Sequence, residues 1–239
     1  MQRKRSVSTL SRGELTSGTI FFILYLVVLP FAAGPIFRLV ELLLGVNLSS
    51  SLENALYYYI LFAVTVIIFH GFLMRTSSLL LDNLNDAAQT LGLGLVGLYG
   101  LNELVYRLSS LLTGGRSIGT NLNDMAISAQ ISGAPRTTLL IVVLLAPFVE
   151  EVLFRGLVFG GLREKSRWIA YLASCLLFAL LHVWQFAVAN RDAVYFLLMA
   201  QYLIPGLVLA WAYDHSGTLW ASVALHAGVN ALSVLAGSV

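Results

Sequence analysis

Long apolar runs separated by short polar segments make up most of the chain. A helix needs about 20 apolar residues to cross the hydrocarbon core of a bilayer, and about seven runs reach or approach that length. The pattern therefore predicts an all-α fold, a polytopic transmembrane helix bundle with about seven spans, and it is compatible with six to eight. The predicted spans are 18–44, 53–74, 86–112, 137–162, 167–189, 193–213 and 217–237.

The predicted spans form one membrane domain in three parts: a basic segment 1–17, N-terminal helices with a long loop at 18–136, and C-terminal helices at 137–239. The first apolar run is too long for a cleaved signal peptide, whose core has about 7–15 residues. Pro30 and Pro35 predict kinks within it. The third span is the weakest, because Glu103 and Arg107 interrupt it, and these two residues are spaced as an i,i+4 ion pair.

Composition agrees with a membrane protein. The 239 residues are 58% hydrophobic and 11% charged, whereas a soluble domain carries roughly 25% charged residues. The net charge of +2 gives no indication of a nucleic-acid partner, and the single cysteine, Cys175, excludes a disulfide framework. The expected surroundings are the lipid bilayer, and the sequence carries no signal of oligomeric state.

Basic residues predict the orientation, because short loops rich in Lys and Arg favour the cytoplasm. The N-terminal residues 3–5 and the loop 163–167 are the two densest basic segments, and a seven-span arrangement puts both on one side. We therefore expect a multi-pass protein with a cytoplasmic N-terminus, although Arg116 and Arg136 fall on the outer side. The small size favours a prokaryotic cell membrane.

Adjacent carboxylates at Glu150 and Glu151 occupy the middle of the fourth predicted span. A charge at the bilayer centre costs about 2.5–3.5 kcal/mol on insertion scales, so such residues are usually functional. The two side chains project about 100° apart on a helix, and Arg155 lies about 40° from Glu151. The spacing predicts a Glu151–Arg155 ion pair and leaves Glu150 available. The alternative is that all three residues only fix helix packing.

Other polar side chains reach a similar depth in the C-terminal spans. His182 lies in the fifth predicted helix, and His226 and Asn230 share one face of the seventh. Glu150 and an imidazole can activate a water for attack on a carbonyl, while a second imidazole and an amide stabilise the oxyanion. Each residue alone also fits a packing role through interhelical hydrogen bonds. Their joint occurrence favours hydrolysis.

Several further residues are expected to be structural. The cluster Tyr57, Tyr58 and Tyr59 is typical of an aromatic belt at the membrane interface. Asp214 and His215 are assigned to a loop between the last two spans.

Three short motifs occur in order on successive predicted helices: EExxxR from Glu150 to Arg155, FxxxH from Phe178 to His182, and HxxxN from His226 to Asn230. With this order and placement, segment 137–231 resembles the CPBP family, the CAAX proteases and bacteriocin-processing enzymes, also called the Abi family. The remainder of the chain, 1–130, carries no motif of that family.

The resemblance implies an intramembrane glutamate-dependent endopeptidase. It implies that Glu150 and His182 activate water and that His226 and Asn230 form the oxyanion hole. Glu151 and Arg155 would have supporting roles. The resemblance also implies a metal-independent mechanism with no cofactor, although zinc held by Glu150 and both histidines is chemically compatible.

Rival protease classes lack their motifs in this sequence. No histidine is followed by glutamate, so the zinc-binding HExxH pattern is absent. Neither Gly-x-Ser-Gly nor Gly-x-Gly-Asp occurs, which disfavours rhomboid-type serine and presenilin-type aspartyl proteases. A transporter using Glu150 would show internal repeats, and we see none.

The expected partner is a membrane-associated protein or peptide substrate. A prenylated CAAX-type tail, a peptide precursor and a membrane protein all fit. The alternative function is a non-proteolytic scaffold, immunity or partner-binding protein that has kept the fold.

Overall fold

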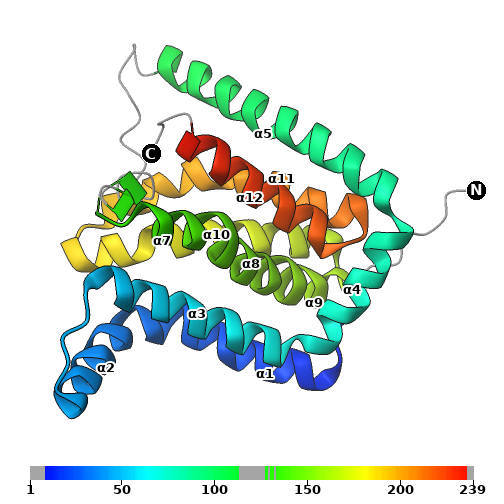
Figure 1. The fold of residues 1–239 in the computed structure, drawn as a ribbon. Coiled ribbons are helices and arrows are strands. Elements are labelled where there is room, and N and C mark those ends of the chain that lie inside the picture. The colour runs from blue at the N-terminus through cyan, green and yellow to red at the C-terminus, as the bar shows by residue number, and fades with distance from the viewer. Residues whose placement is uncertain (1–8, 113–126, 129, 132, 236–239) are drawn as a thin grey trace, which may run out of the picture.

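A computed structural model describes residues 9–112, 127–128, 130–131 and 133–235, and no strand occurs within them (Figure 1). The protein is thus an all-α bundle, as predicted. The sequence predicts its longest loop at 113–135, and this loop lies largely outside these ranges. The basic residues 3–5 lie wholly outside them. The helical elements are α1 (Arg12–Ile23), η1 (Leu24–Val28), α2 (Leu29–Leu44), α3 (Ser50–Ile68), α4 (His70–Asp82), α5 (Leu84–Leu112), α7 (Pro135–Leu140), η2 (Ile141–Leu145), α8 (Ala146–Glu151), η3 (Val152–Phe159), α9 (Gly160–Arg163), α10 (Arg167–Asn190), η4 (Ala193–Met199), α11 (Ala200–Ser216) and α12 (Leu219–Leu235).

Helices occur at all the predicted spans, but fewer of them qualify as membrane-crossing. Within the described ranges, five stretches are long and apolar enough: Arg12–Leu44, Ser50–Ile68, Pro135–Arg163, Arg167–Asn190 and Ala193–Ser216. Helix α5 has 29 residues but no sufficiently apolar window, and α12 is apolar with only 17 residues. The polar residues that interrupt α5 explain the first case. The Glu103–Arg107 ion pair forms there at 2.6 Å, on an exposed face.

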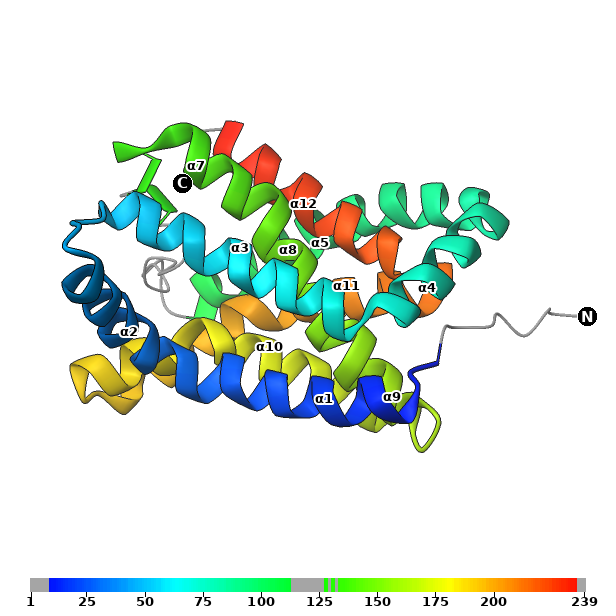
Figure 2. The same cartoon turned by 60° about the horizontal axis from the view of Figure 1, so that its bottom comes forward.

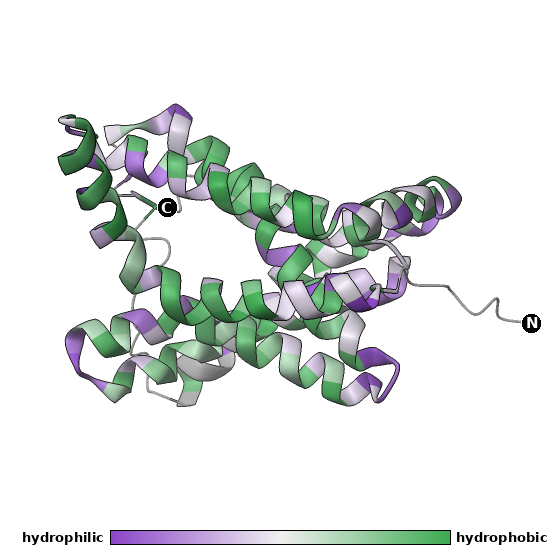
Figure 3. Ribbon diagram, turned by 90° about the horizontal axis from the view of Figure 1, so that it is seen from below, coloured by the Kyte–Doolittle hydropathy of each residue, from purple (hydrophilic) through white to green (hydrophobic). Residues whose placement is uncertain are grey.

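Large apolar side chains cover the outside of the bundle. Leu42, Ile67 and Val96 expose 79%, 76% and 73% of their surface, which a water-soluble protein would avoid over so wide an area. Figure 3 shows hydrophobic residues along the middle of most helices and hydrophilic residues mainly toward their ends. This distribution matches a protein whose sides face lipid.

The rod formed by α7, η2, α8, η3 and α9 is the centre of the bundle. Its most apolar window is 67% buried, against 17–33% for the other candidate spans. The N-terminal helices pack against this rod, and the Phe22 and Phe154 rings meet edge to face at 5.3 Å. Gly156 permits a similarly close approach, since a Cβ there would lie 2.9 Å from the Phe72 ring. The core therefore joins both halves of the chain.

Two N-terminal boundaries differ from the prediction. Helix α1 begins at Arg12 instead of residue 18, because Ser11 and Glu14 form a capping box. The predicted span 53–74 breaks at Phe69 into α3 and α4. The Glu14 carboxylate accepts hydrogen bonds from the Phe72 backbone N–H and from Arg75. One buried carboxylate thus fixes the start of α1 against the start of α4.

A bend between α1 and α2 opens one side of the bundle. The five residues of η1 form a π-helical segment, and Pro30 and Pro35 follow within α2. Such interruptions are the usual causes of sharp helix kinks, so the predicted effect of the prolines agrees with the fold. In Figure 2, α2 extends away from the line of α1 beside the end of α3. Residues of α2 line the cavity of the site described below.

Asp214 and His215 lie in the last turn of α11, so assigning them to a loop was wrong. The loop-like feature is Gly217, whose φ of 74° ends the helix. Asp214 is buried, and its carboxylate forms ion pairs with Arg163 at 2.9 Å and with Arg167 at 2.6 Å. These contacts tie the turn between α9 and α10 to the end of α11.

Candidate active site

The two adjacent glutamates end α8, immediately before the π-helical segment η3. Both are buried, with Glu150 8% and Glu151 0% exposed. A π-helical segment changes the rotation per residue and is frequent at functional sites. Their surroundings nevertheless differ almost completely, and each glutamate is described in turn.

Glu151 is enclosed by three hydrogen-bonding side chains. Arg155 Nη1 donates to Glu151 Oε1 at 2.9 Å, so the ion pair expected from the sequence spacing forms. His226 Nδ1 lies 2.9 Å from the same oxygen, and the Ser222 hydroxyl donates to Glu151 Oε2. Since a carboxylate only accepts hydrogen bonds, His226 Nδ1 carries a proton. Glu151 is therefore a closed, fully partnered group.

Arg155 connects this carboxylate to two further helices. Its Nη2 donates to the Gly206 backbone oxygen at 3.1 Å, and its guanidinium carbon lies 4.4 Å from the centre of the Phe178 ring. The Phe178 ring also packs against His182 at 4.7 Å and His226 at 5.9 Å between centroids. The phenylalanine of the FxxxH motif thus contacts the arginine and both histidines.

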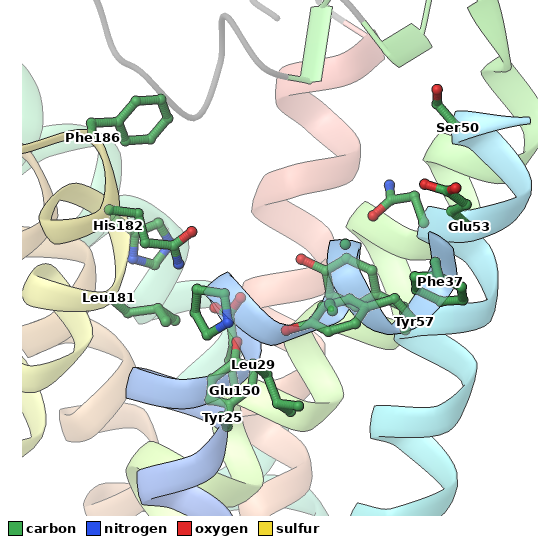
Figure 4. A pocket seen from close by; sticks show the side chains of 16 residues that line it. Tyr25, Leu29, Phe37, Ser50, Glu53, Tyr57, Glu150, Leu181, His182 and Phe186 are labelled. Atoms are coloured by element: carbon green, nitrogen blue, oxygen red, sulfur yellow. The ribbon is translucent and has the colours of Figure 1, made fainter. Parts of the chain in front are cut away.

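Glu150 faces a cavity of about 420 Å³ between the bent α2, α3 and α10 (Figure 4). His182 lines the same cavity, so the structure brings these two predicted residues together. His226 Nε2 lies 4.0 Å from Glu150 Oε2. The same imidazole therefore reaches Glu151 with one nitrogen and approaches Glu150 with the other. Sequence reasoning had placed His226 with Glu150 alone.

His182 has a defined tautomer when it is neutral. Its Nδ1 lies 2.8 Å from the Phe178 backbone oxygen, which can only accept, so Nδ1 donates. The neutral ring then carries a free lone pair on Nε2, which can accept a proton. The ring stacks on Tyr202, with centroids 4.4 Å apart and planes 23° apart. These contacts hold the imidazole at the edge of the cavity.

Asn230 is not among the residues that line the cavity. Its Nδ2 donates to the Val142 backbone oxygen at 2.9 Å, which joins α12 to η2. A side-chain amide has two N–H bonds, and this contact uses one of them. The predicted oxyanion role of Asn230 stays a prediction.

The cavity includes residues that sequence reasoning missed. Tyr57 and Tyr58 line it together with Tyr25, a place that their interpretation as interface anchors did not include. Their neighbour Tyr59 is 49% exposed, as an anchor would be. Ser222, the third partner of Glu151, was missed as well. The available signal was its spacing, because Ser222 lies one helical turn before His226 on the same face.

Within the described residues, no three His, Cys, Asp or Glu side chains gather closely enough to hold a metal ion. Zinc would need neutral imidazoles with free nitrogens. Both Nδ1 atoms of the candidate histidines already donate elsewhere, which leaves only their Nε2 atoms. The cofactor assignment stays a prediction.

Comparison with known proteins agrees with the motifs. Residues 133–232 match the family model described as type II CAAX prenyl endopeptidase Rce1-like. The matched segment runs from the start of the central rod into α12, so it contains both glutamates and both candidate histidines. No solved structure gives a significant match.

Two bacterial relatives match parts of the chain. The UPF0177 protein YxdF of Lactococcus lactis is 32% identical over 87 residues, which are 36% of this chain and 42% of that protein. An uncharacterized 24.3 kDa protein of Escherichia coli is 34% identical over 100 residues, 42% of this chain and 44% of that protein. The matches span less than half the length of either relative. Segment 133–232 is thus similar to the CAAX protease family, the same family that the three motifs resemble.

Proposed function

We propose that the protein is an intramembrane endopeptidase that hydrolyses a peptide bond in a membrane-associated protein or peptide. One observation carries the proposal: of two adjacent buried carboxylates, Glu151 is closed by partners, while Glu150 shares a cavity with His182. A cavity that holds a carboxylate and an imidazole with a free nitrogen suits water activation. The family match of the segment around it supports the same reaction class.

In the proposed reaction, a water in the cavity lies between Glu150 and His182. Its proton passes to these groups while its oxygen attacks the carbonyl carbon of the substrate. The C–N bond then breaks, and the proton goes to the leaving amine. Glu150 and His182 are thus base and acid in turn, and no other reactant is needed besides water.

The oxyanion formed during attack needs hydrogen-bond donors. For this role His226 acts as the imidazolium, because Nδ1 already donates to Glu151 and only a second N–H, on the Nε2 that faces Glu150, can donate to the oxyanion. Asn230 retains one N–H bond beyond its contact with Val142. We propose that both residues support the oxyanion and that Glu151 and Arg155 hold His226 in place.

We further propose that the N-terminus faces the cytoplasm. The start of α1, helix α4 and α9 lie at one end of the bundle (Figure 1). This end carries Arg12, Arg75, Arg163, Lys165 and Arg167. A concentration of basic residues on one side favours the cytoplasm. Cysteine-accessibility labelling from each side of intact membrane vesicles at Ser11 and Ser49, which flank the first long helix, tests this orientation.

Cleavage by purified variants tests the proposed reaction. Wild type, Glu150→Ala and His182→Ala are checked for folding and incubated with a proteome-derived peptide mixture and with membrane-protein extracts. We expect new fragments with wild type only. Identical fragment patterns in all three samples would contradict the proposal. Loss of cleavage with a strong chelator, restored by zinc, would contradict the metal-free form of the mechanism.

A further inference from the structure

The cavity has a second carboxylate, Glu53, which the proposed reaction does not use. Helix α3 turns one face into the cavity, and that face carries Ser50, Glu53, Asn54 and Tyr57. This is the i, i+3, i+4, i+7 spacing of a single helix face. Glu53 lies about one turn, or about 6 Å, from Tyr57 along the helix axis. Figure 4 shows Glu53 apart from Glu150, with Tyr57 nearer to it.

The Asp, Glu, Lys and Arg residues that line the cavity are all acidic. Its lining residues include two carboxylates, Glu53 and Glu150, and no Lys or Arg among the described residues. The Glu53 carboxylate makes no hydrogen bond or ion pair within the described part of the chain. By contrast, Glu14, Glu103 and Glu151 each pair with an arginine. Glu53 is therefore free to meet a positive charge brought by a ligand.

The walls near Glu53 are aromatic. Figure 4 shows Phe37 and Tyr57 beside it and Phe186 on the opposite wall. A Lys or Arg side chain combines an apolar stem with a charged head. The stem would pack on the aromatic walls, and the head would reach Glu53, with cation–π attraction from the Tyr57 ring. An acidic side chain would instead meet two carboxylates.

We infer that Glu53 forms an acidic subsite that selects peptide substrates carrying a Lys or Arg side chain a few residues from the scissile bond. The inference rests on the proposed function, because it takes the Glu150 cavity as the substrate site. It goes further by naming the chemical class of substrate. Recognition at Glu53 acts on binding, whereas Glu150 acts on the reaction.

Matched peptides test the subsite. In one peptide series a single Arg occupies successive positions, and in a second series Gln replaces that Arg. Every peptide is made both with an acetylated and with a free N-terminus. For wild type, we expect the best Arg peptide to be cleaved with a kcat/KM about ten-fold above its Gln counterpart, as for a charge-assisted hydrogen bond. In Glu53→Gln this ratio should fall to about one, mainly through KM. In Glu53→Lys the preference should move to a Glu-containing peptide.

The control is Glu164→Gln, the same chemical change at an exposed position outside the cavity. It should retain the preference for Arg. An equal Arg preference in wild type and Glu53→Gln would overturn the inference. Discrimination by a free N-terminal amine, without dependence on Arg, would overturn the assignment to a side chain.

Binding separates the two proposals. Fluorescence anisotropy with the same labelled peptides is measured on Glu150→Gln and on the double variant Glu150→Gln, Glu53→Gln. We expect tighter binding of the Arg peptide that disappears in the double variant. This result would support the subsite even if no form of the protein cleaves any peptide. An absence of cleavage by every form would contradict the proposed protease and leave the binding result unchanged. Equal binding of Arg and Gln peptides would overturn the subsite, whether or not cleavage occurs.

Discussion

Glu150 and Glu151 are neighbours in sequence but belong to two different regions of the molecule. The region around Glu151 is closed: an arginine, a histidine and a serine hold both carboxylate oxygens, and no part of the residue is exposed. The region around Glu150 is a cavity that His182 also lines. In one region polar groups satisfy each other, and in the other they leave room for a reactant.

The comparison shows how two carboxylates can be kept in an apolar bundle. A buried charge is tolerated when partners compensate it, and breaking such a pair costs several kcal/mol. Glu151 meets this condition within the protein. Among the described residues, Glu150 has only the more distant His226 Nε2 at 4.0 Å, together with the space of the cavity. The closed region therefore provides stability, and the open region is available for chemistry.

The largest expected effect is on activity and follows from the open region. Glu150→Gln keeps the size of the side chain but removes the base. We expect the cleavage rate to fall by about a thousand-fold or more. A fluorogenic peptide assay under single-turnover conditions measures it. A rate within about ten-fold of wild type would remove Glu150 from the mechanism.

Breaking the closed region should affect stability instead. Arg155→Leu leaves the Glu151 charge without its cation, and we expect a loss of about 3–5 kcal/mol in the free energy of unfolding. Arg155→Lys is the matched control, because it keeps the charge but loses the two-pronged geometry to Glu151 and Gly206. It should lose less. Denaturant titration in detergent measures both, and equal losses would show that charge is not the main contribution.

A smaller effect is expected at the third partner of Glu151. Ser222→Ala removes a hydrogen bond to a charged group, which contributes about 1.5–3 kcal/mol in typical cases. We expect the lower end of that range, since Glu151 keeps its two other partners. In a Glu151→Gln background, the loss caused by Ser222→Ala should shrink. An unchanged loss in that background would assign the effect to the Leu209 backbone oxygen, 3.0 Å from the same hydroxyl.

The smallest effect is expected at an exposed pair of the same chemistry. Glu103 and Arg107 also form an i,i+4 pair, but they are 55% and 73% exposed. Exposed pairs contribute little, so Glu103→Gln should change stability by less than about 0.5 kcal/mol. Denaturant titration in detergent measures this change as well. A loss as large as that of Arg155→Leu would show that burial does not distinguish the two pairs.

Local patterns in the sequence predicted much of the fold. Hydropathy located the helices, because a helix needs about 20 apolar residues to cross the hydrocarbon core of a bilayer. The four-residue spacing of Glu151 and Arg155 predicted their ion pair. The break at Phe69 and the early start of α1 were missed. The break at Phe69 depends on contacts of Glu14 with α4, which is distant in sequence. The early start of α1 follows from a capping box that the hydropathy pattern did not show.

The site could be predicted only in part, because its geometry depends on how separate helices rotate toward one another. Helix spacing put His226 and Asn230 on one face, but it could not show that His226 donates to Glu151 or that Asn230 donates to Val142. Tyr57 and Tyr58 line the cavity together with Leu29 and Phe37 of the bent α2. The direction of that bend depends on packing, which a proline in the sequence does not specify.

The most direct test of the division between the two glutamates is the thermal unfolding midpoint of Glu150→Gln compared with Glu151→Gln. Both changes replace a carboxylate by an amide of the same size, one residue apart. The account predicts a midpoint near that of wild type for Glu150→Gln. It predicts a midpoint lower by several degrees for Glu151→Gln, because Arg155 then loses its counter-ion in a buried site. Equal midpoints, or a larger fall for Glu150→Gln, would contradict the account.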